Sequence, residues 1–95
     1  MFVIETRVPT EHASKYIAQL CKHFKHKVPA DYDDVSGMVD FQPGKCSLTA
    51  ERDGLLMRCE SEEESNLGRL KFILEDHLQR FAWREKPVIE WHHLG

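Results

Sequence analysis

KCSLTAERDGLLMRCES, residues 45–61, holds two runs of alternating apolar and polar residues on either side of an Asp-Gly pair. Alternation with a period of two is typical of half-buried strands, and Asp-Gly is a strong signal for a two-residue hairpin turn. With Asp53-Gly54 as the turn, Leu48 is expected to pair with Cys59. The apolar face of this predicted hairpin consists of Cys46, Leu48, Ala50, Leu55, Met57 and Cys59.

A third strand is expected immediately before this hairpin. A two-residue turn at Pro43-Gly44 pairs Val39 with Leu48, which keeps apolar residues opposite apolar residues. A short edge strand is expected further upstream, around Tyr32. The predicted antiparallel meander therefore has three main strands, at about residues 37–42, 45–52 and 55–61.

An amphipathic helix is expected before the meander. The chain begins with a predicted strand at residues 2–8. Thr10 is then expected to cap a helix that ends near Lys27, because Pro29 disfavours helical backbone at the residue before it. The apolar face of this first helix consists of Ala13, Tyr16, Ile17, Leu20, Cys21 and Phe24.

A second helix and a last strand are expected after the meander. Ser61 and Glu64 have the spacing of a capping box, and Pro87 precedes a predicted strand at residues 88–93. The resulting order, β-α-β-β-β-α-β, predicts one α+β domain over residues 1–95. It is a two-layer sandwich with two helices on one face of a mostly antiparallel sheet. The inner face of the second helix is expected to consist of Leu67, Leu70, Leu74, His77, Leu78 and Phe81.

Composition argues against several classes of protein. The formal charge is −3, whereas nucleic-acid binders and proteins of anionic membrane surfaces draw their affinity from excess Lys and Arg. The three cysteines form no CxxC pair, which favours neither a disulfide framework nor a structural zinc site. The sequence shows no signal-peptide pattern and no apolar run of about 20 residues. We therefore expect a cytoplasmic protein that binds neither nucleic acid nor membrane.

The first helix carries a cationic shoulder, defined as Lys22, His23, His26 and Lys27. At about 100° per residue, its histidines and His12 fall along one line beside the apolar face. His12 and His23 lie roughly 16 Å apart along the helix axis, which is too far to share one metal ion. His23 and His26 could share an ion if His77 of the second helix supplied a further ligand.

Recognisable catalytic motifs are missing from the sequence. It contains no GxSxG elbow, P-loop, GxGxxG or HExxH. An enzyme is therefore less expected than a binding module, and we expect no cofactor. His77 is expected to hydrogen-bond a backbone carbonyl rather than to act as an acid or base. Phe72 and Trp83 are expected either to form an exposed aromatic pair or, for Trp83, to fold back onto the core.

Three blocks, LCKHFKHKVP (20–29), GKCSL (44–48) and HLQRFAWRE (77–85), together resemble a family of small bacterial proteins known as domain of unknown function 2218. The resemblance implies a stand-alone domain of this size. The same module is sometimes fused to flavin-dependent siderophore-interacting reductases, so the association suggests a role near iron or siderophore handling. Gln42-Pro43 departs from the family, in which an aromatic residue is expected beside the glycine. The positions that match the family's polar blocks are Lys22, His23, His26, Lys27, His77, Arg80, Arg84 and Glu85.

Three hypotheses for function follow from these observations. The first is a non-enzymatic module that binds a small anionic ligand or a protein partner through the cationic shoulder, together with His77, Arg80 and Arg84. The second is a metal-binding or catalytic protein that uses the three histidines His23, His26 and His77. The third is a homodimer or larger homo-oligomer, in which the basic end of the first helix meets the acidic run 60–64 of another copy, or the outer faces of two sheets pair.

Overall fold

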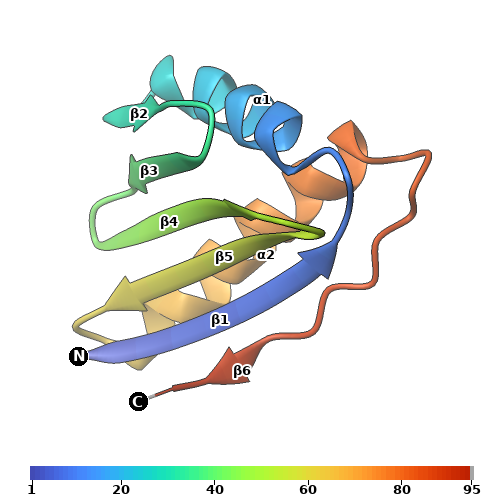
Figure 1. Ribbon diagram of the computed structural model, residues 1–95. Helices are drawn as coiled ribbons and strands as arrows, with labels where there is room; N and C mark the ends of the chain where they lie inside the picture. The colour runs from blue at the N-terminus through green and yellow to red at the C-terminus, as the bar shows by residue number, and fades with distance from the viewer. Residues whose placement is uncertain (95) are drawn as a thin grey trace.

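This computed structural model describes residues 1–94, which contain six strands and two helices (Figure 1). Every neighbouring pair of strands is antiparallel, and the order across the sheet is β2-β3-β4-β5-β1-β6. The α+β fold predicted from the sequence is confirmed, and β2 is the edge strand expected around Tyr32. The elements in chain order are β1 (Phe2–Pro9), α1 (Ala13–Lys25), β2 (Ala30–Tyr32), β3 (Ser36–Asp40), β4 (Gly44–Glu51), β5 (Gly54–Ser61), α2 (Glu64–Phe81) and β6 (His92–His93).

The core lies between one face of the sheet and the two helices (Figure 1). Helix α1 packs on β2, β3 and β4, whereas α2 packs mainly on β5, β1 and β4. In β1, alternate residues are buried, namely Ile4, Thr6 and Val8. The apolar face predicted for α1 is buried in full, because its spacing places all six side chains on one side of the helix. Neither helix of the described residues is long and apolar enough to cross a membrane.

The β4–β5 hairpin has the predicted apolar face but a different register. Glu51 pairs with Gly54, so the turn residues are Arg52 and Asp53 and the predicted Asp53-Gly54 turn is wrong. The pairing of Leu48 with Cys59 is wrong for the same reason. Because the shift in pairing is two residues, every side chain stays on the face predicted for it.

The β3–β4 turn differs from its prediction in the same way. Val39 pairs with Cys46 rather than with Leu48. Gln42 and Pro43 form the turn, and Gln42 has a φ of 36°, in the left-handed region.

Both glycines of the predicted turns lie just inside strands, where other atoms approach closely. A Cβ at Gly54 would lie 3.2 Å from the backbone oxygen of Val8. A Cβ at Gly44 would lie 2.5 Å from Leu70 Cδ1 and 2.7 Å from the backbone oxygen of Glu60. The glycines are therefore needed for close packing, not for the positive φ that the hairpin signal assumes.

The helix caps predicted from the sequence are wrong. His12, not Thr10, flanks the start of α1, and its backbone N–H donates to Thr10 Oγ1 at 3.0 Å. Ser61 ends β5, and α2 begins only at Glu64, so these two residues do not form a capping box. The Ser61 hydroxyl instead accepts a hydrogen bond from Asn66 Nδ2 at 3.2 Å.

The last strand is much shorter than predicted. Of residues 87–94, only His92 and His93 pair with β1, while residues 87–91 run beside the sheet without strand pairing (Figure 1). Trp91 Nε1 donates to Glu75 Oε1 of α2 at 2.6 Å, which ties this segment to the helix rather than to the strand edge.

Phe72 and Trp83, in the α2 region, are both exposed. Helix α2 ends at Phe81, and Trp83 beyond it is 63% exposed, so Trp83 does not fold back onto the core. Phe72, on the outer face of the helix, is 68% exposed.

Candidate functional site

A cleft of about 420 Å³ opens between the end of α1, the β3–β4 turn and the middle of α2, and we call it the helix cleft. Its apolar lining residues are Phe24, Val28, Phe41, Pro43, Leu70 and Ile73. Its polar lining residues are His23, Lys27, Gln42, Asn66, Arg69 and His77.

The helix cleft is lined by cationic and titratable side chains without any carboxylate. None of its described lining residues is Asp or Glu, although the whole chain has 16 acidic residues against 13 basic ones. Lys27 and Arg69 carry fixed positive charge, and His23 and His77 can each gain one. The cleft is therefore a local exception to the negative charge of the molecule, and it favours anions.

His23 of α1 and His77 of α2 meet at this cleft. Their ring centroids lie 4.5 Å apart, with the planes tilted by 47°. His77 Nδ1 lies 2.8 Å from the backbone oxygen of Ile73. Because a carbonyl oxygen only accepts, Nδ1 must carry the proton, which leaves Nε2 free to contact a ligand. The predicted bond from His77 to a backbone carbonyl is confirmed.

The surroundings of His23 disfavour its protonation. Burial lowers the pKa of His23, and the nearby positive charges of His77, Lys27, His26 and Arg80 lower it further. A negative charge placed beside His23 would act in the opposite direction and raise the pKa. Binding of an anion and binding of a proton are therefore expected to favour each other here.

The rings that form the wall of the cleft are packed edge to face. Phe24 meets Phe41 at 4.9 Å and 79°, His77 at 4.9 Å and 62°, and His23 at 5.2 Å and 82°. Edge-to-face geometry is favourable for aromatic pairs. The imidazole rings are thus positioned by Phe24, which is itself buried in the core.

The cleft contains some of the seven predicted binding residues but not all. Those that line it are His23, Lys27 and His77. Lys22 is exposed on α1 and does not line it. Arg80 Nη2 contacts Asp76 Oδ2 at 3.1 Å, and the Arg84 guanidinium lies 5.1 Å from the Trp83 ring centroid. Arg80 and Arg84 are therefore engaged outside the cleft.

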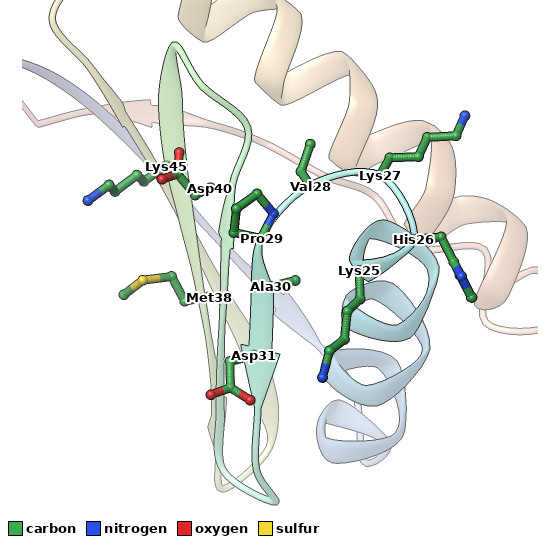
Figure 2. A pocket seen from close by; sticks show the side chains of 10 residues that line it. All are labelled: Lys25, His26, Lys27, Val28, Pro29, Ala30, Asp31, Met38, Asp40 and Lys45. Atoms are coloured by element: carbon green, nitrogen blue, oxygen red, sulfur yellow. The ribbon is translucent and has the colours of Figure 1, made fainter.

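His26, the remaining predicted residue, lines a larger hollow of about 730 Å³ at the β2 edge of the sheet. Figure 2 shows that its lining side chains do not point toward a common centre. Met38 and Lys45 lie on one side of β2, whereas His26 and Lys27 lie on the other (Figure 2). We therefore regard this hollow as open surface at the sheet edge rather than as a ligand site.

The histidines predicted as a metal alternative do not form a three-ligand site. Only His23 and His77 are brought together, and His26 lines the sheet-edge hollow. Within residues 1–94, no group of three or more His, Cys, Asp or Glu side chains is arranged to hold a metal ion.

Arg69 and Asn66 are cleft residues that the sequence reasoning missed. Asn66, Arg69, Ile73 and His77 follow one another at intervals of three or four residues, which places them along one face of α2. The same helical projection that identified the shoulder of α1 could have found this stripe.

The cysteines are buried, as expected for small hydrophobic residues. Cys46 and Cys59 lie opposite each other in β4 and β5, with their Sγ atoms 3.0 Å apart. The hydrogen bond with Cys59, together with burial, raises the pKa of Cys46, and burial raises the pKa of Cys21. Both thiols are poor nucleophiles in such surroundings.

Glu85, one of the positions that match the family's polar blocks, has a structural role. Its carboxylate accepts hydrogen bonds from Tyr16 Oη and from Thr10 Oγ1, the latter at 2.9 Å to Oε1 and 3.0 Å to Oε2. Burial, followed by the bond to Glu85, raises the pKa of Tyr16 to about 12. The bond from Tyr16 lowers the pKa of Glu85. These bonds tie the segment after α2 to the start of α1.

The fold and the helix cleft together define a small α+β domain with a cationic cleft between its two helices. The chain belongs to the family described as "Uncharacterized protein conserved in bacteria (DUF2218)", which it matches over residues 5–92, so the resemblance seen in the sequence is confirmed. It is also similar to PA4090 from Pseudomonas aeruginosa, whose NMR structure has 37% sequence identity and a TM-score of 0.83 over 97% of this chain and 96% of that chain. No curated protein matches the chain.

Proposed function

We propose that this protein is a non-enzymatic module that binds a small anionic ligand in the helix cleft. The observation that carries the proposal is the charge of the cleft: its lining combines Lys27, Arg69, His23 and His77 with no carboxylate among residues 1–94, in a chain of net charge −3. A volume of about 420 Å³ lies within the range that small-molecule sites usually occupy, roughly 300–1,000 Å³.

The donors of the cleft suit carboxylate or phosphate oxygens. Arg69 offers a planar fork for two parallel hydrogen bonds, and Lys27 offers a compact positive charge. His77 Nε2 can accept a hydrogen bond when the ring is neutral and donate one when it is protonated. The ligand therefore receives charge-assisted bonds from α2 and from the turn that follows α1.

The test is a titration of ¹⁵N-labelled protein with inorganic phosphate, acetate and 2-naphthoate, followed by NMR. We expect at least one of these anions to shift the amide signals of His23, Phe41 and Ile73. In the Arg69→Gln variant that affinity should fall about tenfold, as expected when a hydrogen bond to a charged group is lost.

Lys71→Gln is the matched control, because Lys71 is an exposed residue of the same helix that does not line the cleft. It removes the same charge from the molecule and should leave the affinity unchanged. If the two variants weakened binding equally, general attraction would explain it and the proposed site would be wrong. The proposal would also be wrong if none of the anions shifted the cleft signals.

Four expectations from the sequence stay predictions. They are a protein partner on the cationic shoulder, a homodimer, a cytoplasmic location and a role near iron or siderophore handling. The titration can be extended to catecholates to test the last of these.

A further inference from the structure

We infer that the helix cleft selects an organic anion with one carboxylate on a flat aromatic body, in preference to a bare inorganic anion. The inference rests on the proposed function, since it concerns the ligand class of the same cleft. Three observations carry it: the apolar floor, the place of the cations, and the aromatic wall.

The floor of the cleft is apolar surface that the protein leaves incompletely covered. Phe24 and Leu70 are buried in the core, but Val28, Phe41 and Ile73 are only half-buried where they line the cleft. Phosphate or acetate would leave this surface in contact with water. A ligand with an apolar body would cover it, and burial of apolar surface is the main favourable term in such binding.

The two side chains of fixed positive charge are more exposed than the floor residues Val28, Phe41 and Ile73. Lys27 follows the end of α1 and Arg69 lies on α2, and both are exposed. A ligand that fits this arrangement carries its charge at one end, near the mouth, and its apolar part below. A single carboxylate matches the planar fork of Arg69 without placing further charge against the apolar floor.

The aromatic wall favours a flat body over a flexible chain. Phe24 and Phe41 already pack edge to face at 4.9 Å, and His77 packs on Phe24 at 4.9 Å. An aromatic ligand can extend this arrangement, because aromatic rings attract one another edge to face or in offset stacks. An acyl chain of similar area would lose rotational freedom on binding and would gain no such contact.

The test compares four probes on the full chain: 2-naphthoate, its uncharged isostere 2-naphthamide, acetate and inorganic phosphate. Binding is followed through the amide signals of the cleft. We expect 2-naphthoate to bind at least about tenfold more tightly than acetate or phosphate, as burial of an aromatic body predicts. We expect 2-naphthamide to bind at least about fivefold more weakly than 2-naphthoate, because it lacks the charge.

The possible failures separate the two proposals. If acetate or phosphate bound in the cleft as tightly as 2-naphthoate, the inference would be overturned and the anion-binding function would stand. If 2-naphthamide bound as tightly as 2-naphthoate, the cleft would be an apolar site and both would be overturned. If no probe reached the cleft, the proposed function would fail first.

Variants of α2 supply an independent check on the apolar floor. Ile73→Ala should weaken 2-naphthoate about threefold to tenfold and leave the weak binding of acetate unchanged. Phe72→Ala, at the exposed neighbouring position, should change neither affinity. If Ile73→Ala failed to fold, Val28→Ala in the connection between α1 and β2 removes floor surface from the other side and should have the same effect. Equal losses for Phe72→Ala and the floor variants would contradict the inference.

Discussion

At the scale of single residues, the contact between His23 and His77 affects the protonation of His23. The ring of His77 is one of the causes that lower the pKa of His23, after burial. Replacing His77 with Gln removes this positive charge, so the pKa of His23 should rise toward the ordinary value of about 6.5 without reaching it. An NMR titration of the His23 Cε1–H signal measures the change.

His12→Gln is the control for this prediction. His12 lies at the far end of α1, and its replacement should leave the pKa of His23 unchanged. A pKa of His23 that stayed the same in His77→Gln would show that the two rings do not interact in solution.

At two glycines, substitution by alanine should change the free energy of unfolding in opposite directions. At Gly44 a Cβ would clash with Leu70 and with the backbone of Glu60, so Gly44→Ala should lower the free energy of unfolding by about 1–3 kcal/mol. At Gly68, on the exposed face of α2, a Cβ would meet nothing within 4 Å. Gly68→Ala should therefore raise the free energy of unfolding by up to about 1 kcal/mol. Urea denaturation measures both, and equal signs would contradict the packing described for Gly44.

The limits of sequence reasoning are clear at these residues. The backbone bond of His77 could be predicted, because an isolated histidine on an apolar helix face needs a nearby acceptor. Its contact with His23 could not, since it depends on how α1 and α2 pack on the sheet. A helical projection could have placed Arg69 on the same face of α2 as His77. An exposed arginine does not by itself indicate a binding site, however, because that depends on the cleft beside it.

At the scale of elements, the faces of the strands were predictable and their pairing was not. Burial distinguishes one face from the other, so alternation in β4 and β5 determined which side chains point inward. A shift in pairing by two residues leaves those faces unchanged, so periodicity cannot detect it. Gly44 and Gly54 misled the turn assignments because close packing, rather than a positive φ, is the reason for a glycine at each position.

The bond between Tyr16 and Glu85 gives a prediction at this scale, because it joins α1 to the segment after α2. Tyr16→Phe should lower the free energy of unfolding by about 1 kcal/mol at neutral pH. The loss arises because the carboxylate of Glu85 no longer accepts a hydrogen bond from the phenol of Tyr16. The hydrogen bond from Thr10 to this carboxylate remains. Thermal or urea denaturation measures the difference.

Alkaline pH tests the burial of Tyr16 together with this bond, and the expected change has a definite sign. The pKa of Tyr16 is raised to about 12, so the folded chain keeps a proton that the unfolded chain releases near pH 10. The free energy of unfolding should therefore fall as the pH rises through this window. Tyr16→Phe should lack this part of the fall, whereas Tyr32→Phe should retain it. A wild-type-like fall in Tyr16→Phe would contradict the raised pKa that burial and the bond to Glu85 give to Tyr16.

At the scale of the whole molecule, the net charge of the chain is negative, whereas the charge of the helix cleft is positive. The value of −3 predicts weak general attraction to polyanions, but it gave no indication of a cleft without carboxylates among its described lining residues. The two-layer fold followed from the order of amphipathic elements. The cleft forms where α1, α2 and the β3–β4 turn come together, and no local sequence pattern predicts how these three elements pack.

The most direct test of the account is to locate a bound anion by intermolecular nuclear Overhauser effects between 2-naphthoate and the labelled protein. We predict contacts from the naphthyl protons to the methyl groups of Val28 and Ile73 and to the ring of Phe41, which line the helix cleft. Contacts to Met38 in the sheet-edge hollow, with none to Ile73, would place the anion elsewhere and contradict the proposed site.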